Sequence, residues 1–260
     1  MTYMKEFRFL DIEYPEDPHL SLATEEAIFM EVMKGNSPPT FRFYRHSNAV
    51  ILGCFQQADQ EVDMDVANKN DIHIVKRFTG GGAVYHDLGN LNFSVISRDT
   101  FDIGLNVTKL YSTMINGAVN AFRSLGMDAQ SGKLNDVTVN GKKILGAAAT
   151  IREKTVLFHA CVLVDVNLHM LASTLKVPGV KLKDKGIQTI LERVTNIKEI
   201  TGHGVPEVRE ALMGSYSKSL GIELVQGDIT GAEKKLANEL HQEKYVKREW
   251  THGREMVSPF

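Results

Sequence analysis

Hydrophobic residues recur every three to four positions in several segments, which is the spacing that one buried helix face requires. Residues 21–35 predict a helix with Ser21 as its N-cap and Gly35 as its terminator. Residues 106–125 predict a longer amphipathic helix that stops at Gly126. The other predicted helices lie at 60–70, 167–175, 206–220 and 231–245, and the polar tail over 245–260 is predicted to be irregular.

Alternating apolar and polar residues predict strands in the rest of the chain. These strands lie at 40–46, 72–78 and 91–97, with a continuous apolar run at 49–55. Gly53 inside that run indicates a buried strand that another group approaches closely. Asn140 and Gly141 separate two further alternating runs, which is the strongest short-range signal for a hairpin. We therefore predict an α+β fold, with a mixed, largely antiparallel sheet flanked by helices, in a single domain over 1–260.

Composition narrows the class of protein without identifying it. Hydrophobic residues make up 43% and charged residues 24% of 260 residues, as in ordinary globular proteins, and the formal net charge is −2. We therefore expect neither a nucleic-acid partner nor a membrane, and the N-terminus has no signal-peptide pattern. Cys54 and Cys161 lie in apolar runs without metal-ligand spacing, so we expect buried thiols and a cytoplasmic location.

The three consecutive glycines at 80–82 need a physical reason, because glycine loses more backbone entropy on folding than any other residue. The spacing matches neither a P-loop nor a dinucleotide-binding loop, since no Lys-Ser/Thr follows and the next residues predict a strand. Bare glycine N–H groups can form a concavity for an anion, and Arg77 just before them offers a planar donor fork. A tight hairpin with a glycine bulge explains the same residues equally well.

A second group of polar residues surrounds the Asn140-Gly141 turn. Asn135 and Asp136 precede it, and two adjacent lysines follow it just before a run of small residues at 146–149. Neighbouring side chains on a strand face opposite ways, so only one of Lys142 and Lys143 can point inward. Solvent-exposed lysines are the commoner outcome in a hairpin, but an inward lysine beside small residues would let a flat ligand lie against the sheet.

These segments resemble a known family. "RFTGGGAVYHDLGNLNFS" together with "LND", "KKILGAAA" and "FHACVLVD" is similar to the lipoate–protein ligases, which share a superfamily with biotin ligases and octanoyltransferases. The resemblance runs over nearly the whole chain and implies the biotin/lipoate ligase catalytic-domain fold. It also implies ATP-dependent activation of lipoate to lipoyl-AMP, followed by transfer of the lipoyl group to a lysine of an acceptor protein.

The resemblance also implies roles for individual residues. Lys143 matches the family's catalytic lysine, which contacts the acyl carbonyl and the α-phosphate. ATP and lipoyl-AMP are expected to contact Arg77, Gly82, Ala83, Val84, Tyr85, His86, Asn90, Asn135 and Asp136, besides Lys143. Asp136 is also the expected residue for the Mg²⁺ that accompanies ATP, and Arg45 and Gly53 are expected to border the lipoate pocket. The sequence leaves open whether the donor is lipoate or octanoate.

The implied partners are lipoyl domains of 2-oxoacid dehydrogenases or the glycine-cleavage H protein. The resemblance further implies that the family's small accessory domain is absent here and is supplied as a separate polypeptide, which activation of lipoate would then require. The main alternative is a cysteine-dependent octanoyl- or lipoyltransferase on the same fold. A non-catalytic lipoate- or adenylate-binding regulator ranks last, because we find no DNA-binding segment.

Overall fold

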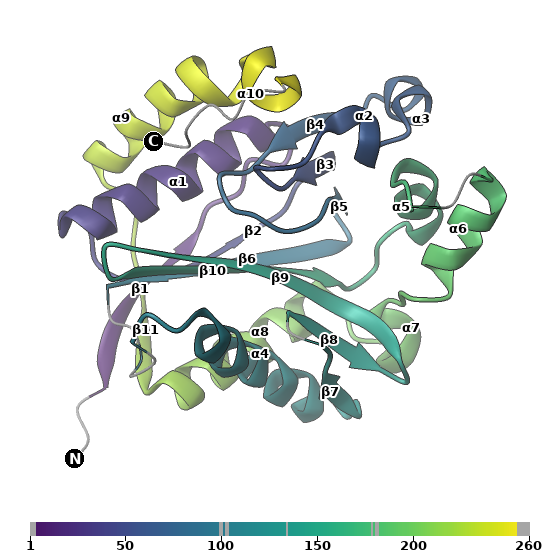
Figure 1. The fold of residues 1–260 in the computed structure, drawn as a ribbon. Coiled ribbons are helices and arrows are strands. Elements are labelled where there is room, and N and C mark those ends of the chain that lie inside the picture. The colour runs from purple at the N-terminus through teal and green to yellow at the C-terminus, as the bar shows by residue number, and fades with distance from the viewer. Residues whose placement is uncertain are drawn as a thin grey trace.

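A large and a small β-sheet form the centre of the molecule (Figure 1). The computed structural model describes residues 4–98, 101, 104–133, 135–177, 179 and 182–253. The eight-stranded sheet has the order β11-β1-β2-β6-β10-β9-β8-β7, and the three-stranded sheet has the order β4-β3-β5. The strands are β1 (Lys5–Asp11), β2 (Thr40–Tyr44), β3 (Asn48–Leu52), β4 (His73–Lys76), β5 (Val84–Asp87), β6 (Asn90–Ser97), β7 (Ala129–Ser131), β8 (Asp136–Val139), β9 (Lys142–Arg152), β10 (Thr155–Leu163) and β11 (Ile222–Gln226).

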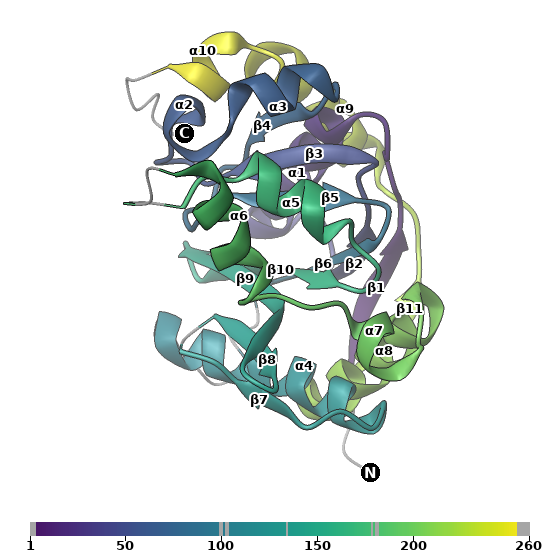
Figure 2. The same cartoon turned by 90° about the vertical axis from the view of Figure 1, so that its right-hand side faces the viewer.

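Helices cover both faces of the large sheet (Figures 1 and 2). They are α1 (Pro18–Lys34), α2 (Ala58–Glu61), α3 (Met64–Lys69), α4 (Val107–Ser124), α5 (Leu168–Thr174), α6 (Lys183–Leu191), α7 (Ile197–Thr201), α8 (Val205–Leu220), α9 (Gly231–Leu240), a π-helical turn η1 (His241–Tyr245) and α10 (Arg248–His252). Helices α4 and α8 pack on one face around a core that includes Phe93, Phe158 and Tyr216. On the other face lie α1 and the small sheet.

The predicted architecture is confirmed, because most neighbouring strands pair antiparallel while β1 pairs in parallel with both β2 and β11. The predicted hairpin is also confirmed: Asn140 and Gly141 join β8 to β9 with φ of 51° and 76°, as a two-residue turn with two positive φ angles requires. Gly35 ends α1 in the left-handed conformation, with φ of 80°.

Two predicted helix limits were wrong. Helix α1 begins earlier than expected, because the carboxylate of Asp17 accepts a hydrogen bond from the Leu20 N–H and acts as the N-cap, whereas Ser21 is buried inside the helix. The helix expected at 60–70 is interrupted at Val62, which bridges to Leu175, and Asp63 caps the new helix α3.

Strands β1 and β11 were not predicted, and a buried charge explains the omission of β1. Arg8 in the middle of β1 is only 7% exposed and forms a buried ion pair with Glu233 and hydrogen bonds with Thr40. A charge on the inward face breaks the apolar alternation that identifies a strand. The tail was expected to be irregular but contains α10, and residues 254–260 lie outside the described part of the chain. Among the described residues no helix combines the length and apolar character needed to cross a bilayer.

Candidate active site

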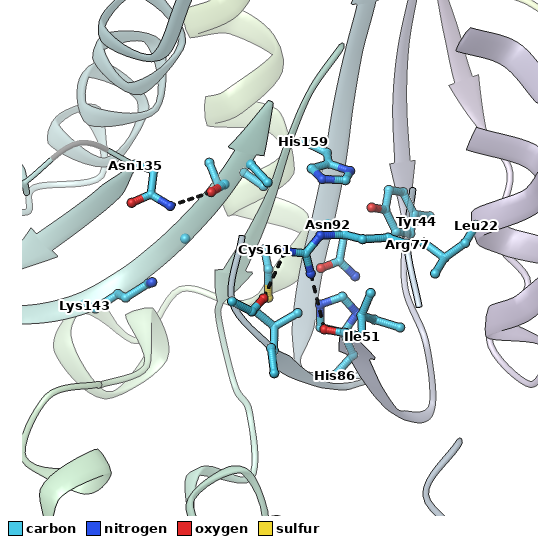
Figure 3. A pocket seen from close by; sticks show the side chains of 17 residues that line it. Leu22, Tyr44, Ile51, Arg77, His86, Asn92, Asn135, Lys143, His159 and Cys161 are labelled. Carbon is cyan, nitrogen blue, oxygen red and sulfur yellow. Dashed lines mark hydrogen bonds between the residues drawn. The ribbon is translucent and has the colours of Figure 1, made fainter. Parts of the chain in front are cut away.

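A cavity lies between the large sheet and the loop of consecutive glycines (Figure 3). Its floor includes one row of residues that crosses four strands, because Gly146 pairs with Cys161, Cys161 with Asn92, and Asn92 with Tyr44. Side chains in such a row face the same side of a sheet. The other lining residues are Leu22, Ile51, Arg77, Gly82, Ala83, Val84, His86, Asn135, Lys143, Ala147, Ala148, His159 and Ala160.

Lys143 stands at one end of this cavity, while its neighbour Lys142 is exposed to solvent. Its Nζ lies 2.6 Å from Oδ1 of Asp136, and both side chains are about one-third exposed. Gly146 makes this position possible, because a Cβ there would lie 2.7 Å from both Cε and Nζ of Lys143. The prediction that one lysine points inward, and that it is Lys143, agrees with this placement.

The main chain around Lys143 is fixed by a neighbouring segment. The Lys143 N–H donates to the Arg193 carbonyl at 2.7 Å, and the Thr195 N–H donates to the Lys143 carbonyl at 3.2 Å. Just before the adjacent strand β8, the Asn135 side chain donates to the Ala147 carbonyl at 2.7 Å. The backbone is therefore held on both sides, while the lysine side chain is partly exposed and contacts the carboxylate of Asp136 through its ammonium.

Glycine is needed at Gly53, Gly81 and Gly82 for three different reasons. A Cβ on Gly53 would lie 2.0 Å from the Gly81 carbonyl oxygen, so the strand end and the loop touch backbone to backbone. Gly81 itself has φ of 96°, which side chains strongly disfavour. Nothing lies within 4 Å of a Cβ built on Gly82, so that position borders open space in the cavity. The absence of a side chain there leaves its backbone accessible to a ligand.

Arg77 holds the loop from inside. The side chain is 6% exposed, and its guanidinium donates to the carbonyls of Gly80 at 2.7 Å, Gly82 at 2.9 Å and Ile51 at 3.3 Å. Its Nε also contacts the Thr79 hydroxyl at 3.1 Å. These bonds fix the glycine carbonyls on the side of Arg77.

A buried polar chain connects helix α1 to this arginine. Oε2 of Glu25 lies 2.7 Å from Nδ1 of His159, whose Nε2 lies 2.9 Å from the hydroxyl of Thr79. Burial alone would raise the pKa of Glu25, but His159 and Arg42 beside it lower the pKa overall, so the carboxylate stays ionised. The chain therefore links a fixed negative charge in α1 to the glycine loop.

Two buried histidines face each other on the side of the cavity formed by the small sheet, where His86 is one of the lining residues. Nδ1 of His46 lies 3.0 Å from Nδ1 of His86, and both Nε2 atoms are buried without a hydrogen-bond partner. Burial and the nearby Arg77 lower the pKa of His86 to about 3, and burial together with His86 lowers the pKa of His46 well below its ordinary value. Both rings are neutral at physiological pH, so one Nδ1 donates and the other accepts.

The cysteine thiols are not activated. Sγ of Cys161 accepts a hydrogen bond from Nδ2 of Asn90 at 3.0 Å, and burial raises the pKa of Cys161 to about 12. Burial also raises the pKa of Cys54. Because the thiolate is the reactive form, both thiols are poor nucleophiles near neutral pH.

The structure gathers seven of the predicted site residues along the cavity: Arg77, Gly82, Ala83, Val84, His86, Asn135 and Lys143. The other five lie outside its lining. Asp136 pairs with Lys143, and Asn90 binds the Cys161 thiol from behind. Gly53 supports the glycine loop, the Tyr85 hydroxyl donates to the Asn48 side chain, and Arg45 forms an ion pair with Glu13.

Sequence reasoning missed Glu25, Asn92 and His159 as parts of the site. All three are polar and less than 7% exposed. Periodicity gave no signal for Asn92, because it shares one face of β6 with the polar Asn90 and Ser94, and an alternating strand normally turns such a face to solvent. For metal binding, the described residues contain no group of three or more His, Cys, Asp or Glu side chains placed to hold an ion.

Comparison with known proteins places this fold and cavity in a family. The family model of the lipoyl protein ligase A/B catalytic domain matches residues 17–217. The chain belongs to this family. Lipoate-protein ligase A subunit 1 of Thermoplasma acidophilum is 44% identical over 259 residues, which cover 95% of this chain and 97% of that protein.

Solved structures agree with this assignment. A bi-partite lipoate protein ligase of Thermoplasma acidophilum, described together with its E2 lipoyl domain, superposes with a TM-score of 0.90 at 43% identity and covers 97% of this chain and 98% of that chain. A lipoate-protein ligase A with bound ATP gives a TM-score of 0.88 at 40% identity, over 96% of this chain and 100% of that chain. The octanoyltransferase LipM of Brevibacillus brevis is also similar, with 29% identity over 95% of this chain and 99% of that protein.

Proposed function

We propose that this protein activates lipoate with ATP to form lipoyl-AMP and then transfers the lipoyl group to a lysine of a lipoyl-domain protein. Membership of the ligase family and the ATP-bound relative support the class of reaction. The observation that carries the proposal is the position of Lys143, whose ammonium stands at one end of a narrow cavity that has Leu22, Tyr44 and Ile51 at the other end (Figure 3).

In the first step, an oxygen of the lipoate carboxylate attacks the α-phosphorus of ATP, and the bond to the β-phosphate oxygen breaks to release pyrophosphate. Two anions approach each other in this step, so a cation between them stabilises the transition state. Lys143 takes that role in our proposal. Its present partner is a carboxylate, Asp136, at 2.6 Å, which shows that the ammonium already accommodates an oxyanion at this place.

The glycine loop would hold the nucleotide phosphate. Gly82, Ala83 and Val84 line the cavity, and Tyr85 follows them in the chain. Gly82 leaves room for a phosphate to approach its main chain. In the proposal Arg77 orients this loop through the carbonyls of Gly80 and Gly82 and adds positive charge behind it. His86 completes the wall, Asn90 holds the Cys161 thiol from behind it, and Asn135 lines the cavity together with Lys143.

Asp136 fits a magnesium ion that arrives with ATP. Mg²⁺ commonly binds through one or two carboxylates and takes its other ligands from phosphate oxygens and water. A single carboxylate beside the phosphate site therefore suffices, and the ion would supply positive charge there. When ATP occupies the cavity, Asp136 would exchange its contact with Lys143 for one with the ion.

In the second step the ε-amino group of the acceptor lysine attacks the acyl carbonyl of lipoyl-AMP. The mixed anhydride bond breaks, AMP leaves, and the amine loses a proton to solvent. We propose lipoyl domains, including those of 2-oxoacid dehydrogenases and the glycine-cleavage H protein, as acceptors. We further propose that residues 1–260 form the single catalytic domain, that a separate accessory chain assists activation, and that the protein acts in the cytoplasm. The bi-partite composition of the Thermoplasma acidophilum ligase supports the separate chain.

A lipoylation assay tests the proposal directly. The purified chain is incubated with a lipoyl domain and either lipoate with Mg-ATP or synthetic lipoyl-AMP, and the mass of the acceptor is measured. Product from lipoyl-AMP is the expected minimum. Product from both donors would show activation without an accessory chain, and no product from either donor would overturn the proposal.

A further inference from the structure

Asn92 carries an unused pair of hydrogen-bonding groups into the cavity. The residue lies on β6, lines the cavity and is 1% exposed. Neither Oδ1 nor Nδ2 of its carboxamide has a hydrogen-bond partner in the protein. A buried amide without partners is costly, so its presence in a ligand cavity indicates a ligand that satisfies it.

The register of the sheet shows which part of a ligand Asn92 would meet. Lys143 folds over Gly146, and Asn92 lies two strands further along the same row, with Cys161 between them. Neighbouring strands are about 4.8 Å apart, so Asn92 is roughly 10 Å from the Gly146 position. Figure 3 shows the same order, with Lys143 at one end and Asn92 between Cys161 and Tyr44. An acyl group whose carboxyl lies at Lys143 would therefore present its tail to Asn92.

The chemistry of the two candidate tails differs at this point. The end of an octanoyl chain is a hydrocarbon and would leave the buried amide unpaired, whereas the dithiolane ring of lipoate offers sulfur, a weak hydrogen-bond acceptor. The protein already contains such a contact directly behind the cavity lining, because Nδ2 of Asn90 donates to Sγ of Cys161 at 3.0 Å. The nearby His86 adds a second unpartnered atom, Nε2, and its neutral ring brings no charge to the tail.

We propose that Asn92 is a specificity-determining residue that selects an acyl group with a sulfur-containing tail over a plain alkyl tail. This inference rests on the proposed function, since it takes the acyl carboxyl to lie at Lys143. It predicts lipoate rather than octanoate as the preferred acyl group.

Two substitutions test the role of Asn92, because valine and threonine have nearly the same shape and differ by one hydroxyl. Dissociation constants for lipoate and for octanoate are measured by calorimetry with the wild type, Asn92→Val and Asn92→Thr. One hydrogen bond corresponds to a factor of about threefold to tenfold in affinity. We expect the wild type to prefer lipoate by about this factor, Asn92→Val to lose the preference, and Asn92→Thr to keep part of it.

Ile51→Val serves as the matched control at the apolar end of the cavity and should weaken both acids alike. If the wild type binds the two acids equally, Asn92 holds only an ordered water and the inference is overturned. The same holds if Asn92→Val keeps the wild-type preference. If the wild type binds neither acid and transfers no lipoyl group from lipoyl-AMP, the proposed function itself fails.

Discussion

The two walls of the cavity are built in opposite ways. On the side of the glycine loop, Arg77 is 6% exposed and its donors are engaged with main-chain carbonyls and a hydroxyl. On the side of the hairpin, Lys143 is 37% exposed and is held by the side chain of Asp136. A bond to a backbone carbonyl inside a folded loop is hard to exchange, whereas an ion pair at a partly exposed site can be exchanged for a ligand at little cost.

The two walls therefore differ in role: one supports the structure of the site, and the other takes part in the proposed reaction. The wall with Arg77, the arginine wall, gives the glycine loop its shape. The wall with Lys143 and Asp136, the lysine wall, carries the positive charge that a reacting anion can bind. Changes to the loop should therefore lower stability together with activity, whereas changes to the lysine wall should lower activity alone.

The largest effect is expected from removing the ammonium group of Lys143. Lys143→Ala should lower the rates of both adenylation and transfer by about 10²–10³-fold, the range typical for one electrostatic group that stabilises a transition state. Pyrophosphate release and acceptor mass measure the two steps. Lys142→Ala is the control, since that side chain points to solvent, and it should keep most of the activity. Equal losses in both variants would contradict the assignment of the inward lysine.

The structural role of the arginine wall is best tested at Gly53, which contacts the glycine loop. A Cβ there would lie 2.0 Å from the Gly81 carbonyl oxygen, and neither backbone can move without displacing the loop. Gly53→Ala should therefore lower the free energy of unfolding by about 3 kcal/mol, at the upper end of the cost of overpacking. Urea denaturation measures this loss. An unchanged stability would mean that the loop is held less tightly than its contacts with Arg77 indicate.

Gly146 offers the matching substitution on the lysine wall. Its added Cβ would lie 2.7 Å from the flexible end of Lys143 and in ordinary contact with Oδ1 of Asp136 at 3.8 Å, so Gly146→Ala should displace the ammonium and leave the fold intact. We expect adenylation to fall by about tenfold to a hundredfold, as displacement of a catalytic group by an ångström can cause, with little change in the unfolding midpoint. A loss of stability as large as that of Gly53→Ala would erase the distinction between the two walls.

The same contrast explains how far the sequence alone led. The turn of the lysine wall could be predicted from local sequence, because Asn140-Gly141 specifies it, and strand alternation allows only one of Lys142 and Lys143 to point inward. The choice of Lys143 came from the resemblance to the ligase family, which also added the roles. The arginine wall depends on contacts between distant segments, such as that of Glu25 with His159. Local periodicity contains no information about such contacts. For the same reason the parallel strand β1 was missed, because its buried Arg8 is satisfied by Glu233, which lies far away in the sequence.

A smaller, pH-dependent effect should come from the histidines behind the glycine loop. The folded protein holds His86 with a pKa of about 3, against 6.5 for an ordinary histidine. Below pH 6.5 the unfolded chain therefore binds more protons, and stability falls as the pH falls. Between pH 7.5 and 5.5 His86 alone should account for a loss of about 1.4 kcal/mol. His46 shifts in the same direction. Urea denaturation at the two pH values measures the loss, and a variant with both histidines replaced by leucine should lose less; an equal loss would contradict the assignment.

The smallest effect is expected from the thiols, although Cys161 lies on the cavity floor between the two walls. Its pKa of about 12 leaves almost no thiolate at neutral pH, and the thiol only accepts a hydrogen bond from Asn90. A serine hydroxyl can accept the same bond, so Cys54→Ser/Cys161→Ser should transfer the lipoyl group from lipoyl-AMP within about threefold of the wild-type rate. A thiolate mechanism predicts the opposite, namely an acyl-enzyme mass in the wild type that disappears together with activity in the double variant. That result would mean that a thiol of the protein, and not the nucleotide, carries the acyl group. The cavity floor would then take part in the reaction.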